Sequence, residues 1–222
     1  MIHETRGKGV KYSRIIVGII GLFVSCVHAQ SLDIGARVGM NLAYYENINF
    51  AGDMPREPAA GFIGGIQSDY WIKPSWALSG QILYVQSKTE ISYSDGIPQS
   101  GMTGQRSVYT ENFLEIPVEI KLRFTIDHDL QIYAFAGGTA DFLLTAFKTN
   151  YSGAGMQSVT QDYTTLDSSR PIFGAIGGLG FNLNFIPKVT IFVEGDYRLG
   201  LTNSDFYAGD LRYFLGTLFQ IF

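Results

Sequence analysis

The stretch FLEIPVEIKLRF, residues 113–124, alternates apolar and polar side chains from Leu114 onward, with one proline on the polar side. Successive side chains of a β-strand point to opposite faces of a sheet, so this alternation predicts a strand with one apolar and one polar face. Isoleucine, leucine and valine fill the apolar face, whereas two glutamates, a lysine and an arginine lie on the other. Such a strand separates an apolar environment from a polar one.

The same period of two recurs along the chain, in stretches bounded by turn residues. We predict eight strands, over about 31–46, 58–71, 76–92, 109–125, 130–146, 170–186, 189–203 and 208–222. Short turns at 73–74, 127–129 and 187–188 alternate with longer polar connections at about 47–57, 93–108 and 147–169, and a shorter one at 203–207. Short turns at one end and long loops at the other are typical of a bacterial outer-membrane barrel. The sequence therefore predicts an all-β fold, a transmembrane antiparallel up-and-down β-barrel of about eight strands, with both termini at the periplasmic end.

The first 29 residues have the pattern of an export signal. A basic start precedes an apolar run over 15–24, and Val27-His28-Ala29 offers a small-residue cleavage site. The apolar run is too short for a membrane-spanning helix, which needs about 20 residues. We expect a signal peptide over 1–29 and a barrel domain over 30–222. A weak lipobox around Cys26 leaves lipidation there as an alternative to cleavage after Ala29.

The charge of the mature chain excludes one class of partner. The full chain has 16 Lys+Arg and 20 Asp+Glu, and the signal contains four bases and one acid, which leaves 12 against 19, a net of about −7. Nucleic acid is an unsuitable partner, because phosphate binding needs a basic surface. The single mature histidine, His128, lies in a predicted turn, and no Cys/His cluster offers a metal site. We therefore expect no enzymatic activity, catalytic residue, metal or cofactor.

The chain ends on a phenylalanine that closes the last predicted strand. This ending is common in outer-membrane barrels, so we expect the insertion machinery to recognise this strand, and outer-membrane lipid and lipopolysaccharide to surround the barrel. Both faces of residues 211–222 carry apolar side chains, so the sequence leaves open which face meets lipid. Aromatic residues cluster where strands end, and Trp71 and Trp76 flank one short turn. Their positions predict two aromatic girdles at the membrane interfaces.

A resemblance to a known family supports the same fold. The strand FLEIPVEIKL, residues 113–122, resembles the recurring Leu-Glu-Ile-Pro strand of Bacteroidetes-type outer-membrane β-barrel proteins, the PorT-like "porin family" group. Glycine pairs at 64–65, 137–138 and 177–178 add to the likeness, which extends over the mature chain. The resemblance implies fold and location, and it implies no activity.

The polar face of the barrel is expected to fill its lumen. Eight strands leave an interior just wide enough for side chains. The inward acids would be Asp33, Glu115, Glu119, Asp141, Glu194 and Asp196, and the inward bases Arg37, Lys121, Arg123, Arg198 and Arg212. These numbers are near balance, which favours a neutralised, filled lumen over an ion-selective channel. Periodicity alone leaves open the opposite orientation, a soluble barrel with the charges outside.

The predicted function is that of a non-enzymatic outer-membrane barrel that acts structurally or binds at the cell surface through its long loops. Tyr151 and Tyr163, in the polar connection over 147–169, are the candidate binding residues, since tyrosine gives large contact area at low entropy cost. Two alternatives remain open at this point. One is a PorT-like component of a secretion or assembly apparatus, and the other is a soluble lipocalin-like barrel with an apolar interior.

Overall fold

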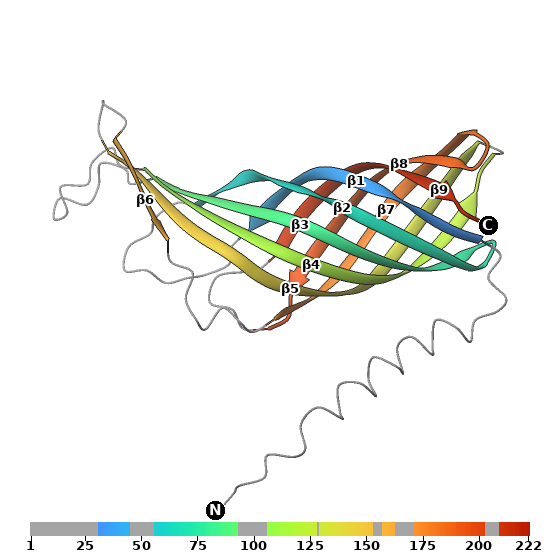
Figure 1. Ribbon diagram of the computed structural model, residues 1–222, viewed down its shortest axis with the longest axis horizontal. Helices are drawn as coiled ribbons and strands as arrows, with labels where there is room; N and C mark the ends of the chain where they lie inside the picture. The colour runs from blue at the N-terminus through green and yellow to red at the C-terminus, as the bar shows by residue number, and fades with distance from the viewer. Residues whose placement is uncertain are drawn as a thin grey trace, which may run out of the picture.

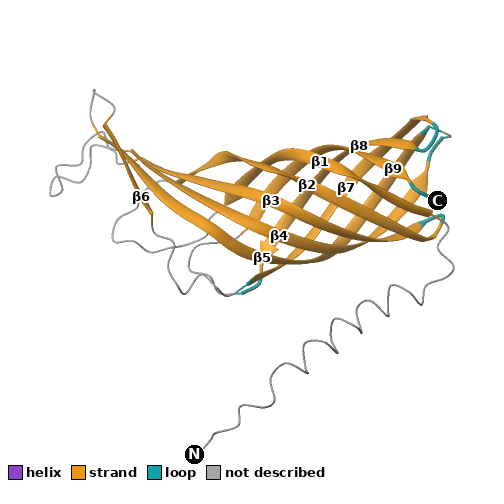
Figure 2. Ribbon diagram, in the orientation of Figure 1, coloured by secondary structure: helices purple, strands orange, loops and turns teal. Residues whose placement is uncertain are grey.

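The protein is an antiparallel β-barrel in a computed structural model that describes residues 31–44, 56–127, 129–152, 157–162, 171–202 and 209–222, except 93–105 (Figure 1). The described strands are β1 (Ser31–Tyr44), β2 (Arg56–Lys73), β3 (Trp76–Ser92), β4 (Arg106–Thr125), β5 (Leu130–Ser152), β6 (Gln157–Asp162), β7 (Ile172–Ile186), β8 (Val189–Gly200) and β9 (Gly209–Gln220). Figure 2 shows the strands crossing the barrel wall at a common tilt. None of the described residues forms a helix long and apolar enough to span a bilayer.

Eight of these strands close the barrel. The hydrogen-bonded order runs β4-β3-β2-β1-β9-β8-β7-β5, and the pairing of β4 with β5 closes it. The first and last strands pair from Asp33↔Gln220 to Tyr44↔Gly209. Both ends of the barrel chain therefore lie beside the turns that follow β2, β4 and β7, as Figure 1 shows. The predicted fold class, including the strand number of the barrel, is confirmed.

The prediction of one long connection over 147–169 is wrong as far as residue 162, where β6 ends. β5 continues to Ser152, and β6 pairs antiparallel with it from Phe147↔Asp162 to Ser152↔Gln157. In this segment a run of mostly polar residues replaces the alternation that signals a barrel strand, and such a run predicts a loop. Paired polar strands form a ladder beyond the membrane as readily as within it, because the backbone supplies the hydrogen bonds.

The apolar face of every barrel strand points outward. On β4, for example, Val118 and Ile120 are about half exposed, whereas Glu119 and Lys121 are buried. On β9 the outward side chains include Tyr213 and Leu215, so the face of the last strand that meets lipid is now assigned. A lipocalin-like barrel needs the opposite arrangement, with apolar side chains inside. That alternative is therefore wrong.

The lumen also contains large aromatic side chains that stand over glycines. A Cβ at Gly180 would overlap the ring of Tyr133, and one at Gly216 would overlap the ring of Phe192. These glycines give the inward rings the space that any side chain would occupy. Trp71, which the sequence assigned to an aromatic girdle, is among the inward residues and is only 2% exposed. That assignment is wrong for Trp71, whereas Trp76 is exposed on the outer face.

Candidate functional site: the charged lumen

Buried charges in the lumen form two clusters at different heights. The lower cluster, nearer the short turns, consists of Arg37, Gln67, Asp69, Gln81, Glu119, Lys121, Tyr133 and Glu194. The upper cluster consists of Glu115, Asp141, Asp196, Arg198, Asp210 and Arg212. Antiparallel registry sets these heights, because each residue lies a fixed number of positions from a strand end. Both clusters draw their members from strands on opposite sides of the barrel.

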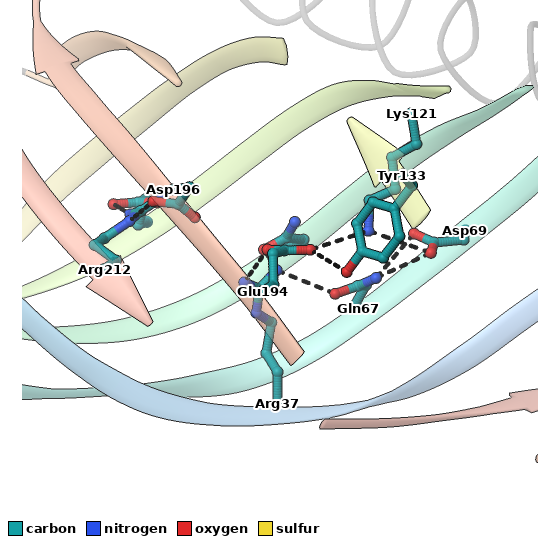
Figure 3. Close-up of polar contacts among 10 residues, drawn as sticks. Arg37, Gln67, Asp69, Lys121, Tyr133, Glu194, Asp196 and Arg212 are labelled. Atoms are coloured by element: carbon teal, nitrogen blue, oxygen red, sulfur yellow. Dashed lines mark hydrogen bonds and ion pairs between the residues drawn. The ribbon is translucent and has the colours of Figure 1, made fainter. Parts of the chain in front are cut away.

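Glu194 is the centre of the lower cluster (Figure 3). Its carboxylate pairs with the guanidinium of Arg37, accepts a hydrogen bond of 2.8 Å from the Tyr133 hydroxyl, and lies 3.7 Å from the Lys121 ammonium. Lys121 also lies 3.3 Å from an oxygen of Asp69. Strands β1, β4, β5 and β8 therefore meet at one carboxylate in the middle of the lumen.

Arg37 connects this centre to the opposite wall. Its Nη1 donates to Gln67 at 3.1 Å and to Gln81 at 2.8 Å. Its guanidinium also stacks on the ring of Phe214, with 3.5 Å between its central carbon and the ring centroid. A cation over an aromatic face is stabilised by the ring quadrupole. The inward phenylalanines of β8 and β9 are thus compatible with a charged lumen.

The upper cluster is built around two arginines. Arg212 donates from Nη1 to both oxygens of Glu115, at 2.7 and 2.9 Å, and from Nε to Asp196 at 2.6 Å. Arg198 pairs with Asp141, and its Nε lies 3.7 Å from Glu115. Figure 3 shows the pair of Asp196 and Arg212 to one side of the lower cluster. Both arginines are fully buried, so these contacts replace their hydration.

Three predicted residues have different surroundings from the rest. Arg123 lies at the periplasmic rim, where its guanidinium stacks 3.7 Å from the ring of Trp71 and donates to the Pro74 carbonyl at 2.7 and 3.0 Å. Asp33, also at the rim, accepts a hydrogen bond of 2.7 Å from the Trp71 indole. Glu119 is buried in the lumen, yet neither of its carboxylate oxygens has a hydrogen-bond partner among the described residues.

The expected near-balance of charge differs from what the structure shows. Among the described residues, eight buried carboxylates face four buried cations. The imbalance arises because Arg123 lies at the rim and because three further acids are buried in the lumen. Asp69, Glu111 and Asp210 are absent from the predicted inward acids, although they are 2%, 9% and 0% exposed. The alternation of each strand could have revealed them. Asp69, Asp210 and Glu111 each lie an even number of positions from a buried residue of the same strand, namely Trp71, Arg212 and Glu115.

Of the two loop residues predicted to bind a partner, the structure describes only Tyr151. Tyr151 is half-buried near the end of β5, where it pairs in register with Arg106 of β4 and Ser158 of β6. Tyr163 lies outside the described residues, as do His128, Cys26 and the whole segment 1–30. Tyr151 is therefore part of a paired strand and not of a free loop.

Comparison with solved structures supports the architecture. The outer membrane protein OprG from Pseudomonas aeruginosa superposes with a TM-score of 0.51 at 9% identity, covering 87% of this chain and 97% of that one. Neisserial surface protein A gives 0.49 at 12% identity, with 85% and 96% covered. The N-terminal β-barrel domain of Pseudomonas aeruginosa OprF gives 0.45 at 17% identity, with 87% and 98% covered. At these identities the likeness to OprG shows the fold alone.

The sequence comparison is more specific. No curated protein has a detectable match to the chain. The family model described as "Outer membrane protein beta-barrel domain" matches residues 28–205, which is most of the chain. The matched segment includes β1 to β8 and with them every residue of the lower cluster, whereas Asp210 and Arg212 of the upper cluster lie on β9, beyond its end. The chain therefore belongs to the family of outer membrane protein β-barrel domains, and it is a small β-barrel protein of the outer membrane.

Proposed function

We propose that this protein is a non-enzymatic surface binder, in which a filled barrel holds a rigid extracellular sheet. The observation that carries the proposal is the unequal height of the wall. β7 pairs with β5 only as far as Asp141↔Ile172, whereas β5 continues to Ser152. β3, β4, β5 and β6 together extend the wall at the end opposite the C-terminus and the start of β1 (Figure 1). A barrel whose only role is structural does not need a wall that is taller on one side.

Side chains on the extension are polar and fixed by contacts. Ser107 on β4 donates to Asn150 on β5 at 2.8 Å, and the hydroxyls of Thr149 and Thr160 lie 3.2 Å apart across β5 and β6. The Lys148 ammonium lies 5.2 Å from the ring centroid of Tyr109. Binding residues held on a rigid scaffold lose little entropy when a partner binds. Tyr109 and Tyr151 supply the amphipathic contact area that binding surfaces use.

The paired lumen charges support a closed interior. Arginine side chains from β1, β8 and β9 cross the space that a pore would need, and each is fully or almost fully buried. We therefore propose that the barrel acts as a support and not as a conduit. A narrower placement in the PorT-like group rests on the β4 strand FLEIPVEIKL. We also propose that the mature chain begins after Ala29, which N-terminal sequencing of the exported protein tests.

Site-specific photo-crosslinking on intact cells tests the surface-binding role. A photoreactive amino acid replaces Tyr109 or Tyr151 on the extension, and matched controls carry it at Lys188 in a periplasmic turn or at Phe124 on the lipid face. We expect adducts with macromolecules supplied from outside the cell only at the two extension positions. Deleting residues 153–162, which removes β6 and the connection to it, should abolish these adducts and leave the barrel pairing intact.

Two results would contradict the proposal. The first is the absence of external adducts at Tyr109 and Tyr151 across a panel of host cells, matrix components and whole bacteria. The second is a set of adducts confined to Lys188 and to periplasmic proteins. That second result would favour a role in a secretion or assembly apparatus.

A further inference from the structure

Glu119 differs from every other carboxylate of the lower cluster. It lies on β4 in the middle of the wall, is 1% exposed, and has no hydrogen-bond partner for either oxygen among the described residues. Asp69 and Glu194, by contrast, contact Lys121 or Arg37. A buried carboxylate without a hydrogen bond is strongly unfavourable, because no donor replaces the water that it has lost. Something other than these side chains must neutralise Glu119.

The charges around Glu119 leave one positive charge missing. The lower cluster contains the carboxylates of Asp69, Glu119 and Glu194 and the cations of Arg37 and Lys121, which gives a net charge of −1. The groups that act most strongly on Glu119 are Lys121 of its own strand, Arg37 of β1, and Glu194 and Asp196 of β8. The formal charges of these four groups, two positive and two negative, sum to zero. A single added positive charge would therefore neutralise the cluster.

The immediate neighbours of Glu119 are small and supply oxygen. Ser79 of β3 lies directly opposite Glu119 in the register, and its buried hydroxyl also has no hydrogen-bond partner among the described residues. Directly opposed residues on one face of a sheet have Cβ atoms about 4.5–5.5 Å apart. On the other side, Gly137 of β5 opposes Glu119 and has no side chain to cover it. A ligand at this position would meet two carboxylate oxygens and one hydroxyl oxygen.

We propose that the lumen binds one monovalent cation, a proton or an alkali metal ion, at the Glu119 carboxylate beside the Ser79 hydroxyl. A divalent metal ion fits less well. In the part of the chain that the structure describes, no group of three His, Cys, Asp or Glu side chains is placed to hold one. The nearby cations Arg37 and Lys121 also oppose a second positive charge. Neutralisation by one charge lets Glu119 remain buried in a barrel that lipid surrounds.

Two measurements on the full mature protein, refolded in lipid vesicles, distinguish the two cations. The first is the infrared difference spectrum between wild type and Glu119→Gln, in which a carbonyl band of a protonated carboxylic acid identifies the proton. The second is the urea midpoint in sodium, potassium or N-methylglucamine chloride at equal ionic strength. For a bound alkali ion, the midpoint rises with the logarithm of that ion's concentration in wild type and is constant in Glu119→Gln.

Control variants separate the site from general salt effects. Glu90→Gln removes a carboxylate at the outer end of β3, outside the cluster, and should keep the wild-type band or ion response. Ser79→Ala should weaken the response to an alkali ion several-fold and leave a proton band in place. An ionised Glu119 together with equal midpoints in all three salts would overturn the proposal. Failure of Glu119→Gln to fold, judged by heat-modifiability, would also overturn it, because the amide has the neutral charge that a bound cation confers.

Discussion

Replacement of Arg212 by methionine should be among the most destabilising single substitutions in this barrel. The guanidinium is fully buried and makes the short contacts to Glu115 and Asp196 that hold the upper cluster. Methionine fills much of the volume but leaves Asp196 without its ion pair, whereas Glu115 keeps only Arg198 at 3.7 Å. Removing one partner of a buried ion pair costs about 3–5 kcal/mol, because the remaining charge is uncompensated. We expect a loss of this size for Arg212→Met.

A double-mutant cycle measures the origin of that loss. The free energy of unfolding is determined by urea titration in lipid vesicles, under conditions where unfolding and refolding curves coincide, for Arg212→Met, Asp196→Asn and the double variant. Neutralising Asp196 should recover part of the loss, with a coupling energy of about 0.5–3 kcal/mol. Lys148→Met is the matched control on the extension of the wall, and it should cost less than about 1 kcal/mol. A loss below about 0.5 kcal/mol for Arg212→Met, or no coupling to Asp196, would refute the reasoning.

Three further predictions use the lipid face, the rim and the lumen. Val118→Arg places a charge on the middle of the lipid face, where Val118 is 52% exposed. This substitution should lower the free energy of unfolding by about 2–4 kcal/mol in the same titration, whereas Phe124→Arg, near the interface, should lower it by about 0–1 kcal/mol. Equal costs would contradict the assigned membrane position. Trp71→Phe removes the indole hydrogen bond to the Asp33 carboxylate and should cost about 1.5–3 kcal/mol, so an unchanged unfolding midpoint would show that this bond contributes nothing. The purified protein should form no large, stable channels in planar bilayers, and reproducible porin-sized conductance would disprove the closed lumen.

The sequence predicts the wall of the barrel well because the membrane imposes a simple rule on it. Each strand must present apolar side chains to lipid at every second position, so residues 113–124 reveal both the strand and its orientation. The rule is weaker for the last strand, where Phe214 and Leu218 point inward beside Arg212. The inward phenylalanine is stabilised by the stacked Arg37 guanidinium, a contact between β1 and β9 that no local pattern contains.

The partners within the lumen follow from the stagger of strands and are harder to predict. The contact of Lys121 with Asp69 joins residues 52 positions apart, and that of Arg212 with Glu115 joins residues 97 apart. A shift of the register by two residues would keep every apolar side chain outside and change these pairs. The strand β6 is difficult to predict from the sequence for a related reason. Above the membrane no apolar face is needed, so a polar strand has the composition of a loop.

The seam between β1 and β9 makes the barrel wall continuous although the chain is linear. The amide of Leu32 donates to the carbonyl of Phe222 at 3.3 Å, and the amide of Ile221 donates to the carbonyl of Leu32 at 2.8 Å. A short peptide linker could therefore join the two ends, and new ends could be opened at the turn between Pro187 and Lys188. Such a circular permutant would contain the same barrel but release its strands from the ribosome in a different order. It would test whether the place of β9 in the order of synthesis matters separately from its role in closing the cylinder against β1.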